Sequence, residues 1–452
     1  MDTVTVVSLI IFAATYILML SFQKIRPYVA VASAVLFVVL GSLSVFDGFS
    51  YTFLDALGEI DWNVIMMIAG TMGTVYLFIE SKMPQLMSDV LISKMPNVKW
   101  AVLALSLFAG IISAFVDNVA TVLMIAPVAL AFCKKIKISP VPSIVCIAVS
   151  SNLQGAATLV GDTTSILLGK AANLDFTDFF VDNGRVGMFF VVEAGALVSG
   201  LIILLMFRKE KAGIEINDRT QVDDKIPSIL LVATVVTLIA VSFIPYKSNA
   251  APGEFYKPDI TNGLICMLYF AIGLIREVVK TKNFSVVKGA FKEIDYYTIT
   301  LLAGLFVVIG GITRAGVIDK IGTLIAGIGG GGENSVFLMY TIIVWMSVIL
   351  SAFIDNIPYT ATMLPVVAVI ASSLSAAGGT QVDPKLFYYG LLCGATLGGN
   401  LTPIGASANI AGIGILRKEG YEVKAGTFMK YGIPFTLSAV ITGYLLIWFI
   451  WK

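Results

Sequence analysis

Long apolar runs recur along the whole chain and constrain its fold more than any other feature. They lie near residues 4–22, 28–46, 62–79, 141–168 and 187–207 in the first half and near residues 227–245, 260–275, 296–313, 386–416 and 431–451 in the second. A helix needs about 20 apolar residues to cross the hydrocarbon core of a bilayer. Helices satisfy their own backbone polar groups there. The runs therefore predict an all-α polytopic membrane protein, in the plasma or inner membrane, with the lipid bilayer as its main partner.

Charge and residue usage exclude several functions. Only 13% of the 452 residues are charged, against about 25% in soluble proteins, and the net charge of +1 gives no reason to expect a nucleic-acid partner. The chain has no histidine, so carboxylates are the main groups left for proton handling. The four cysteines show no CxxC spacing and favour packing over metal binding. We expect no cofactor beyond a coupling ion, Na⁺ or H⁺.

Three pairs of similar segments follow one another in the same order in the two halves. Glu59–Asp61 matches Glu293–Asp295, Ser113–Val128 matches Ser351–Val366, and Thr158–Ile166 matches Thr402–Ile410. Offsets of 234, 238 and 244 residues that drift slowly indicate a duplication. We predict a first repeat at residues 1–207, a cytoplasmic linker at 208–226 and a second repeat at 227–452.

Each repeat is predicted to cross the membrane about five times. An odd number of crossings places the second repeat upside down relative to the first, and most basic loop residues then fall on one side, as the positive-inside rule requires. The stretch between Lys99 and Lys134 encloses only 34 residues, too few for two spans of about 20 residues. We therefore expect a re-entrant hairpin with Asp117 at its tip, and by repetition a second hairpin around Asp355.

Two carboxylates at hairpin tips are costly inside a membrane. An unpaired one near the bilayer centre costs roughly 2.5–3.5 kcal/mol, so partners, ions or protonation must offset Asp117 and Asp355, unless both lie in loops at the membrane surface. No Lys or Arg occurs in the sequence at either tip. Oxygen ligands suit a hard cation such as Na⁺. The predicted coupling-ion ligands are Ser113, Asp117, Asn118, Ser351, Asp355 and Asn356.

Two further apolar segments are interrupted by polar residues and glycine. Ser150–Gly169 and Gly394–Gly412 are long enough to span but broken midway. Such discontinuous helices are tolerated where they line a cavity and bind ions or substrate; the alternative is small-residue helix packing. With the tip asparagines, the predicted substrate-binding residues are Asn118, Thr158, Gly161, Asp162, Thr163, Asn356, Asn400, Thr402, Pro403, Gly405, Ser407 and Asn409. The position that corresponds to Asp162 holds Ala406.

The repeated motif resembles a known superfamily. Ser-Ala-x-x-Asp-Asn, with Pro nine residues after the Asn and a later Thr-x-Val/Ile-Gly, is similar to the ion transporter superfamily. This includes arsenite permeases (ArsB), NhaD-type Na⁺/H⁺ antiporters, citrate and divalent-anion symporters and P protein permeases. The resemblance covers essentially the whole chain. It implies a homodimer with scaffold and mobile transport domains that works by an elevator-like motion.

The resemblance also bears on the site. In divalent-anion symporters a Ser-x-x-x-Ser-Asn-Thr tip and the facing broken helix hold Na⁺ and substrate. That spacing matches Ser113, Asp117 and Asn118, and again Ser351, Asp355 and Asn356, with Asp in place of the second Ser.

The predicted function is ion-coupled secondary transport of a small ion, by antiport or symport. Three substrates stay open: cations in Na⁺/H⁺ exchange, citrate or another carboxylate, and arsenite or antimonite for efflux. A passive channel is one alternative. An intramembrane aspartyl protease is another, but its Gly-x-Gly-Asp and Pro-Ala-Leu strings are absent. We expect a transporter and not an enzyme.

Overall fold

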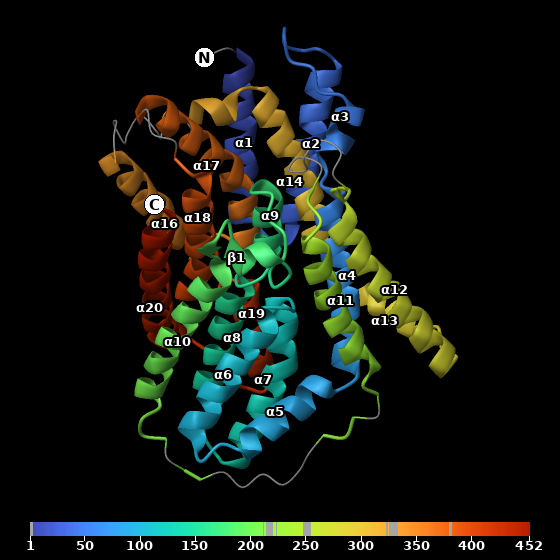
Figure 1. Cartoon of the computed structure of the whole chain (residues 1–452), viewed down its shortest axis with the longest axis vertical. Coiled ribbons are helices and arrows are strands. Elements are labelled where there is room, and N and C mark those ends of the chain that lie inside the picture. The colour runs from blue at the N-terminus through green and yellow to red at the C-terminus, as the bar shows by residue number, and fades with distance from the viewer. Residues whose placement is uncertain are drawn as a thin grey trace.

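Helices make up almost the whole molecule. The structure is a computed structural model that describes residues 3–210, 212–213, 220–222, 224–246, 255–321, 324, 333–378 and 382–452. Within these residues, seven helices are long and apolar enough to cross a membrane, and six shorter apolar helices accompany them. The strands described are the short pair β1 (Val181–Asp182) and β2 (Arg185–Val186). The predicted all-α polytopic fold is confirmed (Figure 1).

The helices follow the order expected from the apolar runs. The first half contains α1 (Thr3–Ser21), η1 (Gln23–Ile25), α2 (Arg26–Ser42), α3 (Phe53–Glu59), α4 (Trp62–Glu80), α5 (Met83–Ser93), α6 (Val98–Ser113), α7 (Asn118–Lys135), α8 (Val141–Gly155), α9 (Thr163–Ala171), η2 (Thr177–Phe179) and α10 (Met188–Met206). The second half contains α11 (Ile226–Ser242), α12 (Thr261–Thr281), α13 (Ser285–Glu293), α14 (Tyr296–Arg314), α16 (Glu333–Ser351), α17 (Asn356–Gly378), α18 (Pro384–Gly398), η3 (Gly399–Leu401), α19 (Ser407–Lys418) and α20 (Ala425–Trp451).

Aspartates begin corresponding helices in the two halves. The carboxylate of Asp61 accepts from the backbone N–H of Val64 at the start of α4, and Asp295 does the same for Thr298 at the start of α14, both at 3.0 Å. A side-chain oxygen at this position satisfies one of the unpaired N–H groups of a helix. The repeated Glu-Ile-Asp segment is thus a helix-start signal in both places.

The chain reverses between α6 and α7 and again between α16 and α17, at the two predicted hairpin tips. The limbs of the first hairpin have 16 and 18 residues, and those of the second have 19 and 23. Both α7 and α17 are long and apolar enough to cross a membrane. Each second limb continues past an internal proline, Pro127 or Pro365.

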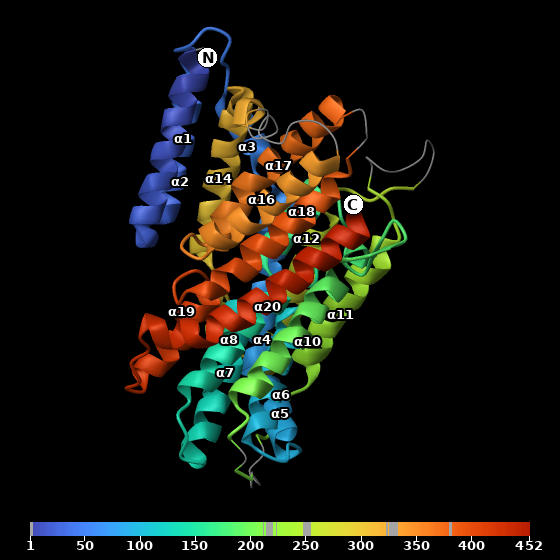
Figure 2. The same cartoon turned by 90° about the vertical axis from the view of Figure 1, so that its left-hand side faces the viewer.

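The helices pack as two groups, and each group draws on both halves of the chain. The core group contains α5–α10 and α16–α20, and the peripheral group contains α1–α4 and α11–α14. Helices α8 and α18 lie at the centre of the core group and are buried along nearly their whole length. The groups meet mainly where α14 contacts α17 and where α4 contacts α9. Figure 2 shows α1 and α2 as a pair at the edge of the molecule.

Part of the linker is held at two points. The backbone N–H and the hydroxyl of Thr220 donate to Asp89 of α5, at 2.9 and 2.6 Å. Four residues later, Asp224 accepts from Lys280 of α12 at 2.6 Å and also from Arg276. The linker therefore connects α5 of the core group to α12 of the peripheral group.

Candidate functional site

Each hairpin tip contacts the interruption of the helix that follows it. The hydroxyl of Thr158 donates to the carbonyl oxygen of Ala114 in the first half, and Thr402 donates to Ala352 in the second. These threonines were predicted as substrate ligands. The structure instead uses their hydroxyls to hold tip and break together, in the same way in both halves.

Glycine is required at the same contact. A Cβ added to Gly161 would lie 2.5 Å from the carbonyl oxygen of Gly155 and 2.7 Å from those of Ser113 and Ala114. Gly405 is similarly close to three backbone oxygens, at 2.6–2.9 Å. Because these neighbours are backbone atoms, they cannot turn aside as a flexible side chain would. Both glycines therefore allow close approach of the chain and do not offer side-chain ligands.

Asparagines connect the two halves at the centre of the core group. The amide of Asn118 donates to Asn152 at 3.0 Å, and Asn152 donates in turn to the side chain of Asn400 at 3.1 Å and to the carbonyl oxygen of Thr396 at 2.7 Å. Asn400 completes the series by donating to the carbonyl oxygen of Val149 at 2.9 Å. Buried amides are stable only when paired, so this network fixes the two broken helices against each other.

Asp162 follows the first interruption and is held from both halves. Its Oδ2 accepts from the hydroxyl of Thr164 at 2.8 Å and from the amide of Asn356 at 3.2 Å. Asn356 belongs to the tip of the second hairpin. The carboxylate is 4% exposed, so these two donors provide much of the polar environment that water would otherwise supply.

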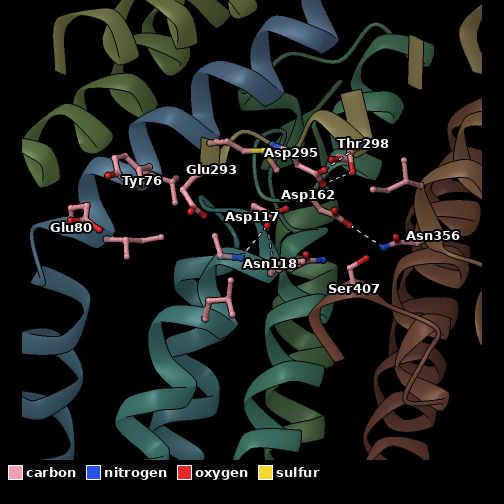
Figure 3. Close-up of a pocket in the computed structure, with 18 residues that line it drawn as sticks. Tyr76, Glu80, Asp117, Asn118, Asp162, Glu293, Asp295, Thr298, Asn356 and Ser407 are labelled. Carbon is pink, nitrogen blue, oxygen red and sulfur yellow. Dashed lines mark hydrogen bonds between the residues drawn. The ribbon is translucent and has the colours of Figure 1, made fainter. Parts of the chain in front are cut away.

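An acidic cavity of about 450 Å³ lies between the two groups of helices (Figure 3). Asp117 and Asp162 enter it from the core group, and Glu80, Glu293 and Asp295 enter it from the peripheral group. None of the described residues that line it is a lysine or an arginine. Five carboxylates in one partly enclosed space create a negative potential that concentrates cations.

The same two core aspartates also line a much smaller cavity. It measures about 10 Å³ and lies beside Ile68, Gly161 and Ile166. Asp117 and Asp162 therefore line both spaces.

The first tip offers several oxygen atoms to a cation but no cluster of acidic side chains. In the part of the chain that the structure describes, no three carboxylates or thiols gather closely enough to hold a metal ion. Ser113 Oγ is buried without a hydrogen-bond partner there, whereas its counterpart Ser351 donates to the carbonyl oxygen of Ala395. A Na⁺ site near Asp117 would thus combine carboxylate oxygens with hydroxyl, amide and backbone oxygens.

The second tip has a different electrostatic partner. Asp355 Oδ2 accepts from Arg26 Nη1 at 3.4 Å and from the hydroxyl of Ser407 at 3.3 Å. Its other oxygen accepts from the backbone N–H of Ile357. No Lys or Arg lies near either tip in the sequence, but in the folded chain Arg26 reaches Asp355 from the start of α2.

The predicted site residues divide into three sets. Those that line the cavity are Asp117, Asn118, Asp162, Thr163, Asn356 and Ser407. Those that join tips, breaks and central helices are Ser351, Thr158, Gly161, Asn400, Thr402, Gly405 and Asn409. Ser113, Asp355 and Pro403 belong to neither set: Ser113 is buried beside the break, Asp355 pairs with Arg26, and Pro403 is half-buried.

Sequence reasoning missed the wall of the cavity that the peripheral group supplies. Asp295 and Glu293 were noticed only as part of a repeated segment, and Tyr76 and Glu80 at the end of α4 carried no motif. The one sequence signal for this wall was the pair of acidic residues in the repeated segment Glu293–Asp295.

The fold and this site define a membrane transporter. The chain belongs to the citrate transporter family, CitMHS, whose model matches residues 16–394. This result confirms the resemblance to the ion transporter superfamily, and with the apolar helices it shows a multi-pass membrane protein.

Several known proteins that resemble the chain carry the name transporter. An uncharacterised transporter of Mycobacterium tuberculosis is 28% identical over 447 residues, which is 98% of each chain. The P protein of Sus scrofa is 23% identical over 98% of this chain and 59% of its own. The YdaH transporter of Alcanivorax borkumensis shares the fold, with a TM-score of 0.57, 15% identity and coverage of 93% of this chain and 97% of its own. MtrF of Neisseria gonorrhoeae matches with the same TM-score and identity.

Proposed function

We propose that the chain is a cation-coupled secondary transporter whose coupling ion, Na⁺ or H⁺, binds at Asp117 and Asp162. The observation that carries this proposal is that both carboxylates line one acidic cavity with no described lysine or arginine in its wall. Charges removed from water are costly unless neutralised. A bound cation or proton supplies that neutralisation here, and its release to the other side of the membrane couples its gradient to transport.

The position of the cavity supports an elevator-like motion. The core group contributes Asp117 and Asn356 to its lining, and the peripheral group contributes Tyr76 and Asp295. A displacement of one group against the other changes which end of the cavity is open while the tip and break residues stay together. The asparagine network and the tip–break contacts lie within the core group, so this group is suited to move as one body.

Cation exchange is the simplest activity that the acidic cavity supports. A second candidate is transport of citrate or a related carboxylate, which the description of the matched family favours. Because the cavity presents carboxylates and no described basic side chain, we propose that such an anion enters together with cations. Efflux of uncharged arsenite needs no basic group either, but no feature of the cavity selects for it.

Reconstituted vesicles test the coupling. The purified protein is placed in vesicles with an imposed Na⁺ or pH gradient, and a pH-sensitive dye and labelled citrate report the fluxes. Asp117→Asn and Asp162→Asn should each abolish gradient-driven flux, whereas Glu422→Gln, which removes an exposed carboxylate on the α19–α20 connection, should transport normally. Full Na⁺- or pH-driven flux of either aspartate variant would reject the proposal, and citrate uptake that requires Na⁺ would identify symport.

A further inference from the structure

Arg26 forms a partly buried ion pair with the aspartate of the second tip. Its side chain is 7% exposed and that of Asp355 is 17% exposed, with 3.4 Å between Arg26 Nη1 and Asp355 Oδ2. Arg26 Nε also donates to the carbonyl oxygen of Met19 at 3.0 Å, which fixes the orientation of the guanidinium group. Arginine stays charged in proteins, so this site holds a permanent positive charge.

The first tip has no such partner. Asp117 accepts from the backbone N–H groups of Val119 and Ala120 at the start of α7, and no basic side chain among the described residues pairs with it. The helix of the second half that occupies the place of α2 is α12, which begins with the uncharged Thr261. The two tips therefore have the same sequence, Ser-Ala-Phe-x-Asp-Asn, and different charge balances.

We propose that Arg26 is a built-in counter-charge that replaces a coupling cation at the second tip, so that each chain takes its coupling cation only at Asp117 and Asp162. This inference rests on the proposed function for the first tip. Arg26 is a positioning residue, because it does not line the cavity and acts through Asp355. Its positive charge neutralises Asp355 at the second tip, as a bound cation neutralises Asp117 at the first.

The ion pair also reaches the first site through neighbouring residues. Asp355 accepts from Ser407, which lines the cavity, and it precedes Asn356, which donates to Asp162. A shift of the second tip therefore moves a donor of Asp162. This connection explains why a fixed charge is useful here: the second tip can hold Asn356 in place while the first tip gains and loses its ion.

Removal of the guanidinium should convert the second tip into a cation site. Thermal unfolding of the purified full chain is measured in detergent while Na⁺ replaces choline at constant ionic strength. Arg26→Gln should melt several degrees lower than the native protein without Na⁺ and should gain about twice the native Na⁺-induced rise. Arg26→Gln/Asp355→Asn should show the same Na⁺-induced rise in melting temperature as the native protein, because both charges at the second tip are gone. Arg26→Lys keeps the positive charge and should behave like the native protein.

The variant series separates this inference from the proposed function. Asp117→Asn should remove the native Na⁺ response, while Arg26→Gln/Asp117→Asn keeps the response that Asp355 has acquired. If Asp117→Asn responds like the native protein, the proposed first site is wrong, but the comparison of Arg26→Gln with the double variant still reports on Asp355. The inference is overturned if Arg26→Gln gains no additional Na⁺ response, or if Arg26→Gln/Asp355→Asn lacks the native one. Should Arg26→Gln not fold, the charge-free variant Arg26→Gln/Asp355→Asn still decides the second criterion.

Discussion

The side-chain amide of Asn356 donates to Oδ2 of Asp162 across 3.2 Å, so the tip of the second hairpin holds the carboxylate of the first broken helix. The two residues are 194 positions apart in the chain. The acidic cavity is therefore assembled from both halves of the protein, and neither half contains the complete site.

Asn356→Ala should strengthen the binding of the coupling cation at Asp162. The amide of Asn356 stabilises the cation-free carboxylate. Hydrogen bonds to charged groups contribute about 1.5–3 kcal/mol, so loss of this donor should raise the apparent cation affinity by roughly tenfold. The cation dependence of flux in vesicles measures the change. Asn97→Ala serves as the control, because Asn97 only caps the start of α6. An unchanged apparent affinity for Asn356→Ala would show that this donor does not stabilise the free carboxylate of Asp162.

Gly161→Ala should disrupt the contact between the first tip and the first break. The new methyl group would lie 2.5–2.7 Å from three backbone oxygens, and overpacking in an interior costs typically 1–3 kcal/mol. We expect a lower melting temperature and loss of transport. Gly414→Ala is the matched control: no atom lies within 4 Å of its new methyl group, and alanine favours a helix by about 1 kcal/mol over glycine. If both variants are equally stable, the close approach at Gly161 is not needed.

Asn152→Ala should destabilise the core group strongly. The change leaves the amide of Asn118 and the oxygens of Asn400 and Thr396 without this partner. An unsatisfied buried polar group costs about 1–3 kcal/mol, so we expect a loss of about 3 kcal/mol or more in the free energy of unfolding, read by thermal denaturation. Ser372→Ala removes an exposed hydroxyl that bonds only within α17 and should change little. Equal melting of the two variants would contradict the structural role of the network.

Asp224 predicts a pH dependence of the linker contact. Partial burial opposes its ionisation, but hydrogen bonds from Arg276 and Lys280 hold the pKa of this carboxyl well below its usual range. A depressed folded-state pKa adds stability above the unfolded value of about 3.9, and this stability is lost as the pH falls through the folded pKa.

The native protein should therefore melt above Asp224→Asn at neutral pH, by an amount that corresponds to about 1 kcal/mol or less. The difference should shrink below about pH 4 and also in 1 M salt, where the screening length falls to about 3 Å. A difference that is constant from neutral pH down to strongly acidic pH would show that the carboxylate charge is not its cause.

The elements of the fold were predictable because their signals are local. Apolar runs gave the helices, including α4 and α14, which the structure begins directly after Asp61 and Asp295. The interruptions of the two broken helices also lie where the sequence has its polar residues and glycines. The glycines mark these positions because the backbone makes close contacts at Gly161 and Gly405.

The charge balance of the site was not predictable, because it depends on residues that are remote in sequence. Arg26 and Asp355 are 329 residues apart, and the letters around Asp355 are nearly those around Asp117. Nothing in either segment tells which aspartate has a guanidinium beside it. The peripheral wall of Glu293 and Asp295 was missed for the same reason: packing of α13 and α14 decides that these groups face Asp117.

The short stretch of chain between Thr220 and Asp224 limits the distance by which α5 and α12 could separate while both anchors hold. A fully extended chain gains at most about 3.3–3.6 Å per residue, so the four steps between these anchors reach roughly 14 Å. A separation of the two anchor points beyond that length, plus the reach of the anchoring side chains, has to release either Asp89 or the basic pair on α12. In the proposed elevator-like motion, the connecting chain would therefore limit how far the core group travels while both anchors hold.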